Sequence, residues 1–200
     1  MVWRRQLRDR VRILDETILS ENWGLVKTTR CMLQRGDGSW QEQRRETYDR
    51  GDGAAILLYC PARRTVILTR QFRFPAYTHG DAGWLVEVPA GKLEGDSPAD
   101  CALKEAEEET GYRVTDLTLV CHAYMSPGSV TEKLSLFVAA YDAEARVSDG
   151  GGLAHEGEDI EVLELGLDEA VAMMRRGEIA DAKSIILLQY LLLEGLVPPA

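Results

Sequence analysis

The chain has 200 residues, 45% of them hydrophobic, and a formal net charge of −10 at pH 7. This length and apolar content suit one globular domain, or one domain with a small appendage. The acidic balance argues against a nucleic-acid partner, because no basic patch is large enough to follow a phosphate backbone. The start of the chain is too charged for a signal peptide, and no apolar run approaches the roughly 20 residues of a membrane span. We therefore expect a cytoplasmic protein with no membrane partner.

The first fifty residues have a β-like pattern. Apolar and β-branched residues recur over 11–14 and 23–33, and a turn signal at Gly36–Gly38 precedes a polar strand over 40–48. The glycine-containing segment Asp49–Gly53 then interrupts the pattern. We expect a small N-terminal antiparallel β unit over residues 1–50 and a second domain over residues 51–200.

The second domain opens with continuous apolar runs over 54–60 and 65–73, which are typical of core strands. Further strand patterns lie at 84–89, 117–125, 134–141 and 160–165, and helical patterns lie at 98–110, 167–176 and 182–193. Strands before and after a central helix, with two more helices at the end, favour an α/β fold in which a mixed sheet is covered on both faces.

The four cysteines and three histidines are scattered along the sequence. No two cysteines form a C-x-x-C pair, and no histidine has a neighbour at metal-ligand spacing. Neither a zinc site nor a disulfide framework is therefore expected, and buried, reduced thiols are the ordinary interpretation.

The central helix has clear boundary signals. Ser97 or Asp96 can serve as its N-cap, Pro98 suits its first position, and Gly111 stands where a left-handed residue ends a helix. The segment from Ala90 onward therefore predicts a loop that runs into a short, well-capped helix.

The same helix carries a cluster of acidic residues. At 3.6 residues per turn, Glu105, Glu108 and Glu109 fall on one face. Like charges at this spacing destabilise a helix by a few tenths of a kcal/mol per pair, so the arrangement favours a bound cation. Carboxylate oxygens are hard ligands, which Mg²⁺ prefers. The pattern predicts a magnesium site on this helix.

Gly91 followed by Lys104–Gly111 (KEAEEETG) resembles the Nudix box, the signature of Mg-dependent hydrolases that cleave nucleoside diphosphates linked to another moiety. The sequence departs from that pattern twice. Lys104 stands where arginine is usual, and Ser97 stands where a glutamate is usual, with Asp96 one position early. The loop before the helix is thus one residue shorter than the standard one.

Further segments resemble, in the same order, the nucleoside-diphosphate-sugar branch of the Nudix family: RRETYDRGDGA, RQFR, YMSPGSVTE and GEIADAKSIILLQYL. The resemblance runs from about Ile18 to Leu192. It implies the Nudix α/β/α sandwich, with Mg²⁺ as cofactor and Mn²⁺ able to substitute. It also implies a homodimer in which the N-terminal β unit is exchanged to complete each active site. The implied reaction cleaves GDP-mannose between its phosphates to give GMP and mannose 1-phosphate.

Carried onto matching positions, the resemblance implies metal contacts at Ala90, Glu105, Glu109 and Glu158. It implies substrate contacts at Trp23, Arg44, Arg45, Glu46, Arg73, Ala90, Gly91, Glu109, Glu132 and Lys183. The chemistry of the residues agrees at several positions, since Arg73 and Lys183 are cations available to a diphosphate and Trp23 could stack on a purine. A surface role for Arg73 and a strand-core role for Trp23 remain as alternatives.

Pyrophosphate hydrolysis needs charge neutralisation on the phosphates and a positioned, activated water. If the helix carboxylates are engaged by metal, the base comes from elsewhere. Glu132 and Glu158 are candidates because both lie on loops at strand ends, and Glu108 could orient ligands or hold a further ion. The sequence leaves open which glutamate activates the water.

Two other functions remain open. ADP-ribose hydrolysis to AMP and ribose 5-phosphate is the nearest alternative, because that sister branch shares the box. A non-catalytic nucleotide-sugar sensor is the second, motivated by the departures at Lys104 and Asp96. Retention of the three helix glutamates argues against loss of the metal.

Overall fold

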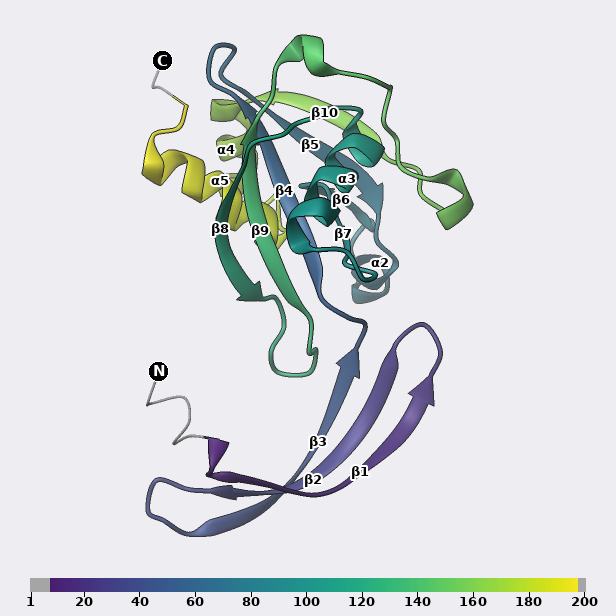
Figure 1. Cartoon of the computed structure of the whole chain (residues 1–200), viewed down its shortest axis with the longest axis vertical. Coiled ribbons are helices and arrows are strands. Elements are labelled where there is room, and N and C mark those ends of the chain that lie inside the picture. The colour runs from purple at the N-terminus through teal and green to yellow at the C-terminus, as the bar shows by residue number, and fades with distance from the viewer. Residues whose placement is uncertain (1–7, 198–200) are drawn as a thin grey trace. The chain divides into compact units, whose positions relative to one another are not determined.

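A computed structural model describes residues 8–197 of the chain, so the first seven residues of the expected N-terminal unit lie outside the described part. The described chain forms two compact units. The first contains the residues up to Gly51 together with Ser126–Glu132, and the second contains Asp52–Met125 and the residues from Lys133 onward. Figure 1 labels the elements of both units.

The first unit is a three-stranded antiparallel sheet in the order β1, β2, β3. Its strands are β1 (Val11–Glu21), β2 (Leu25–Gln34) and β3 (Trp40–Asp49). The strand β1 is longer than the sequence predicts, and Trp23 lies in the bend that joins β1 to β2 instead of in a strand. Because Trp23 is 79% exposed, the alternative that it packs in a strand core is wrong.

The segment Ser126–Glu132 forms an isolated β-bridge with the end of β3. The Tyr48 amide donates a hydrogen bond to the Ser129 carbonyl (2.8 Å), and the Thr131 amide donates one to the Tyr48 carbonyl (3.0 Å). The sequence placed this segment within the second domain. Its main-chain bonds to the end of β3 are the reason that it groups with the first unit.

The second unit is built on a mixed sheet in the order β10, β5, β4, β9, β8. The strands are β4 (Gly53–Cys60), β5 (Thr65–Phe72), β6 (Trp84–Glu87), β7 (Ala90–Lys92), β8 (Leu117–Tyr124), β9 (Lys133–Ala140) and β10 (Glu161–Gly166). The central pair β4 and β9 is parallel, whereas the other pairs are antiparallel. Two short strands extend the sheet, since β6 pairs with β5 and β7 pairs with β4.

Helices cover both faces of this sheet (Figure 1). On one face, Ala55 and Leu57 of β4 pack in a core with α4 (Leu167–Arg176) and α5 (Ala182–Glu194). On the other, Ala54, Ile56 and Leu58 of β4 pack with α3 (Pro98–Thr110). A strand that is buried on both sides needs apolar residues at successive positions, which explains the unbroken apolar run of β4. The predicted α/β/α sandwich is confirmed.

The helix α3 begins and ends as the sequence predicts. Ser97, not Asp96, is the N-cap, and its side-chain oxygen accepts a hydrogen bond from the Asp100 amide (3.2 Å). Gly111 ends the helix in the left-handed conformation, with φ of 79°. The elements that the sequence did not predict include the strand β7 and the short helix α2 (Phe74–His79). None of the helices within residues 8–197 is long and apolar enough to cross a membrane.

Candidate active site

The helix α3 turns a buried carboxylate toward the interior. Glu109 is 1% exposed, and its Oε2 atom has no hydrogen-bond partner within the described residues. Burial, followed by the charges of Glu105, Glu87 and Glu158, raises the pKa of Glu109 well above its ordinary value. A buried carboxylate with an unpaired oxygen is unfavourable, so this position fits a cation.

Glu105 lies one turn earlier on the same helix and is half-buried. Burial, together with the charges of Glu108 and Glu158, raises its pKa to about 7. Glu158 therefore shares an electrostatic environment with both Glu105 and Glu109, although it is distant from them in the sequence. Repulsion among these carboxylates is relieved either by protons or by a metal ion.

The strand β7 approaches the Glu105 carboxylate closely. A Cβ atom added to Gly91 would lie 1.8 Å from Glu105 Oε1, so a side chain at this position would displace the Glu105 carboxylate. The adjacent residue Ala90 pairs with Ala55 of β4. This pairing fixes the main chain that carries the Ala90 carbonyl, which is one of the expected metal contacts.

Glu158 lies on the loop between β9 and β10, where its Oε2 atom accepts a hydrogen bond from the Leu153 amide (2.8 Å). In this arrangement no group of three or more acidic, histidine or cysteine side chains within residues 8–197 is already placed to hold a metal ion. The oxygen donors themselves suit Mg²⁺.

The chain departs from the Nudix pattern at Lys104 and in the shortened loop before α3, and both places form local contacts. Lys104 pairs with Glu108 within the same helix (3.8 Å). The loop closes as a tight turn in which the Asp96 amide donates to the Leu93 carbonyl (2.7 Å). Glu94, inside this turn, has a left-handed φ of 48°. The turn is thus stabilised by main-chain bonding.

A second charged cluster surrounds Glu87, at the end of β6. The Glu87 side chain is 2% exposed, and its Oε1 atom accepts a hydrogen bond from Arg73 Nε (2.6 Å). Its Oε2 atom accepts one from Lys183 Nζ (2.5 Å), which also donates to Asp181 (2.9 Å). Burial alone would lower the pKa of Lys183, but the charges of Glu87 and Asp181 outweigh burial and raise that pKa. Lys183 therefore remains a cation.

The start of α5 holds this cluster in place. Asp181 is the N-cap of α5 and accepts a hydrogen bond from the Ser184 amide (3.0 Å). The Ser184 hydroxyl accepts one from the Val88 amide (2.8 Å), which ties α5 to the segment between β6 and β7. Sequence reasoning missed Glu87 and Asp181. An acidic residue inside the apolar segment WLVEVP was the available signal, because buried charges need partners.

The other predicted site residues belong to the first unit: Trp23, Arg44, Arg45, Glu46 and Glu132. Successive residues of a strand point to opposite faces, so Arg44 and Glu46 share one face of β3 while Arg45 points to the other. Arg44 Nε donates to the Thr28 hydroxyl (2.9 Å). Glu132 forms an ion pair with Arg50 (3.2 Å).

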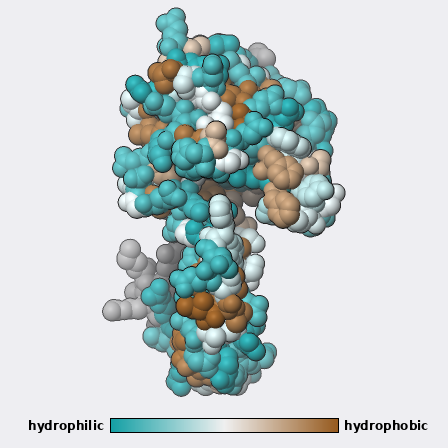
Figure 2. Space-filling model, turned by 90° about the vertical axis from the view of Figure 1, so that its right-hand side faces the viewer, coloured by the Kyte–Doolittle hydropathy of each residue, from teal (hydrophilic) through white to brown (hydrophobic). Residues whose placement is uncertain are grey.

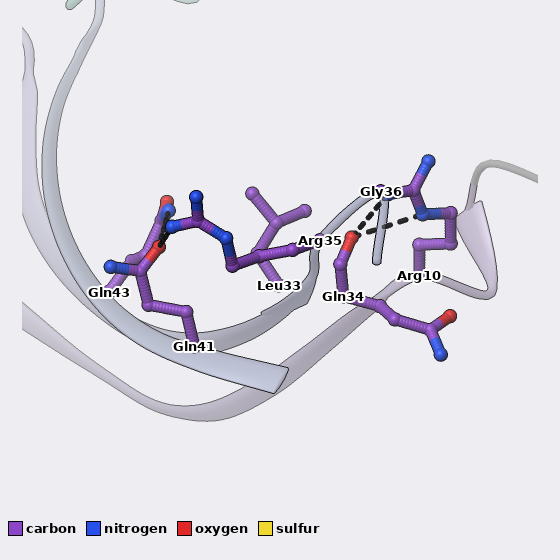
Figure 3. A pocket seen from close by; sticks show the side chains of 7 residues that line it. All are labelled: Arg10, Leu33, Gln34, Arg35, Gly36, Gln41 and Gln43. Atoms are coloured by element: carbon purple, nitrogen blue, oxygen red, sulfur yellow. Dashed lines mark hydrogen bonds between the residues drawn. The ribbon is translucent and has the colours of Figure 1, made fainter. Parts of the chain in front are cut away.

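The first unit also contains an open hollow of about 520 Å³ (Figure 3). Its lining residues are Arg10, Leu33, Gln34, Arg35, Gly36, Gln41 and Gln43. Arg10 donates from Nε to the Gln34 carbonyl (3.0 Å), as the dashed lines in Figure 3 show. None of the predicted site residues lines this hollow.

Two family models together match most of the chain. The NUDIX domain model matches residues 49–187, and the model described as the GDP-mannose pyrophosphatase NudK N-terminal domain matches residues 10–48. The chain therefore belongs to the Nudix family and is a Nudix pyrophosphatase.

Several similar proteins are named GDP-mannose pyrophosphatase. The protein of Pectobacterium atrosepticum is 50% identical over 92% of this chain and 94% of its own length. That of Cronobacter sakazakii is 46% identical over 94% and 97%, and that of Escherichia coli O157:H7 is 43% identical over 96% and 100%. A solved structure described as an ADP compounds hydrolase superposes with a TM-score of 0.70 at 18% identity, covering 94% of this chain and 96% of that one. This last likeness supports the fold.

Proposed function

We propose that this protein hydrolyses GDP-mannose between its two phosphates, giving GMP and mannose 1-phosphate. The observation that carries this proposal is the match of residues 10–48 to an N-terminal domain model described by that enzyme's name. The box on α3 is common to the Nudix family and does not identify the substrate. The N-terminal match does narrow the substrate, because its model is described by the name of one enzyme. Relatives of that name, 43–50% identical over nearly their whole length, support the same substrate.

The proposed metal contacts are the Ala90 carbonyl and the carboxylates of Glu105, Glu109 and Glu158. The unpaired, buried Oε2 atom of Glu109 supports this assignment, because a divalent cation would compensate its charge. When bound, Mg²⁺ supplies charge neutralisation on the phosphates and makes a nearby water more acidic. The chain's own contribution is to supply acidic oxygens from α3 and from the loop before β10, and a main-chain carbonyl from β7.

Arg73 and Lys183 are the proposed phosphate-binding cations of the second unit. Glu87 holds both, so their positions are largely set before substrate binds. The Arg73 side chain is 38% exposed and can reach a ligand, whereas the Lys183 side chain is only 9% exposed. Ala90 and Gly91 would contact the substrate through the main chain of β7, where side-chain bulk is absent.

Trp23, Arg44, Arg45 and Glu46 are the proposed contacts to the nucleoside part. An exposed indole such as that of Trp23 can stack on a flat guanine. Glu132 is the proposed general base, because Glu158 is assigned to the metal and Glu108 lies on α3 between the proposed metal ligands Glu105 and Glu109. The proposed role of Glu108 is then to orient the metal ligands.

We also propose a homodimer in which the N-terminal unit, residues 1–50, is exchanged between protomers. Figure 2 shows apolar side chains gathered on the surface of the first unit. In a single chain the apolar residues of β1 are 43–58% exposed, namely Val11, Ile13, Leu14, Ile18 and Leu19. A monomeric soluble protein seldom exposes so many large apolar side chains on one strand, so a covering partner is expected.

Turnover measured side by side on GDP-mannose, ADP-ribose and ADP-glucose with Mg²⁺ tests the substrate, with the products separated by chromatography. GMP and mannose 1-phosphate are expected to dominate. A preference for ADP-ribose would contradict the proposed substrate while leaving the reaction type intact. Magnesium binding without turnover on any of these compounds would favour the sensor function instead.

A further inference from the structure

The glycine triplet Gly150–Gly152 lies against the C-terminal end of α3. The Gly151 amide donates to the Glu109 carbonyl (2.9 Å), and the Gly152 amide donates to the Glu108 carbonyl (3.1 Å). The last carbonyls of a helix have no partner within the helix, so the triplet supplies partners for two of them. The loop is thereby bonded to the same turn that carries the candidate metal-binding carboxylates.

Only glycine fits at this contact. All three residues of the triplet have φ in the left-handed range, at 67°, 104° and 77°. A Cβ atom on Gly150 would lie 2.6 Å from the Glu109 carbonyl oxygen. A side chain on Gly150 would therefore push the loop away from the helix.

Gly152 also determines where the Glu158 carboxylate can lie. A Cβ atom on Gly152 would lie 2.4 Å from Glu158 Oε2 and 2.9 Å from Glu158 Cβ. The next amide, that of Leu153, donates to the same Oε2 atom (2.8 Å). The carboxylate thus occupies the space that the missing side chain leaves, and the main chain beside it supplies the hydrogen bond.

We infer that Gly152 is a positioning residue that places Glu158 relative to Glu105 and Glu109, by joining the Glu158 loop to the end of α3. This inference rests on the proposed assignment of those three glutamates to a divalent cation. The buried, unpaired oxygen of Glu109 is the independent sign that a cation belongs there. The consequence is that metal affinity depends on a residue that offers no ligand of its own.

Gly152→Ala tests the inference, with Gly177→Ala as a matched control. Gly177 ends α4 with φ of 79°, close to the 77° of Gly152, and a Cβ atom there would meet nothing within 4 Å. Both variants therefore carry similar backbone strain, but only Gly152→Ala displaces Glu158. Calorimetric titration of the full chain with Mg²⁺ alone should show affinity about tenfold lower or worse in Gly152→Ala. Gly177→Ala should match the wild-type affinity within about twofold.

Thermal unfolding of the metal-free proteins separates positioning from general damage. Both variants should lose stability, and equal Mg²⁺ affinity in the two would overturn the inference. In a Glu158→Ala background, Gly152→Ala should change affinity no further, so an additive effect would also contradict it. If Gly152→Ala does not fold, Gly152→Asn carries the same Cβ on a residue that tolerates left-handed backbone better. Failure of the wild type to bind Mg²⁺ would instead refute the proposed metal site.

Discussion

Glu87 and Lys183 form a buried ion pair in which Glu87 Oε2 lies 2.5 Å from Lys183 Nζ and the two side chains are 2% and 9% exposed. The other oxygen of the same carboxylate binds Arg73 Nε at 2.6 Å. One buried carboxylate thus holds both cations that we assign to the substrate phosphates. We expect its removal to affect both folding and substrate binding.

Glu87→Gln keeps the shape of the side chain but leaves two cations without their shared counter-charge. Because breaking a buried ion pair leaves an uncompensated charge, we expect a loss of about 3 kcal/mol in the free energy of unfolding, measured with urea. Glu161→Gln is the control, because its partner Arg70 forms a surface pair in which both side chains are about half exposed. The control should lose at most about 1 kcal/mol. Similar losses in both variants would mean that the Glu87 ion pair contributes no more to stability than a surface ion pair does.

Glu109→Gln removes the charge of the buried glutamate on α3. Turnover should fall at least about a hundredfold, the size expected for one preorganised electrostatic contact. The metal-free protein should keep its stability or gain some, because the substitution removes a buried charge with an unpaired oxygen. Steady-state kinetics and thermal unfolding in a chelator measure the two effects. Near-normal turnover would remove Glu109 from the proposed metal site.

The metal-free protein should be more stable at pH 6 than at pH 8. The pKa of Glu105 is raised from 4.5 to about 7, so the folded state binds this proton more tightly than the unfolded state does. The stabilisation is full below the unfolded pKa and is lost as the pH rises through about 7. The melting temperature in chelator should show this decline, and Glu105→Gln should reduce it. An unchanged pH dependence in that variant would show that other groups are responsible.

Added Mg²⁺ should raise the melting temperature more at pH 8 than at pH 6. Protons and the metal ion compete for the same carboxylates, so fewer protons must be displaced at the higher pH. Melting curves at matched Mg²⁺ concentrations measure this difference. A larger shift at pH 6 would argue against Glu105 as a metal contact.

Removal of residues 1–50 should abolish both the dimer and the activity, if the N-terminal unit completes the site of a partner. Light scattering gives the oligomeric state, and turnover with Mg²⁺ gives the activity. Ile18→Asp is a gentler test, because Ile18 is 56% exposed in a single chain and the change places a charge on the proposed interface. A fully active monomer from either protein would refute the exchange.

The sequence by itself determined the local elements and the family. The boundaries of α3 follow from Ser97, Pro98 and Gly111, because capping depends on residues within one turn. The apolar run of β4 predicted a strand buried on both faces, and the acidic pattern of α3 predicted the Nudix class. These signals lie within a few residues of one another, so a linear pattern contains them.

Only the tertiary structure decided which distant residues share an environment. Glu87 and Lys183 are 96 positions apart, and their pairing depends on how α5 packs against the segment after β6. The strand β7 forms because β4 supplies a pairing partner, and its three residues carry too little pattern to be recognised alone. The role inferred for Gly152 could not be predicted from the sequence either, because it depends on the space that this residue leaves for the Glu158 side chain. Packing fixes such contacts, and local propensity does not encode them.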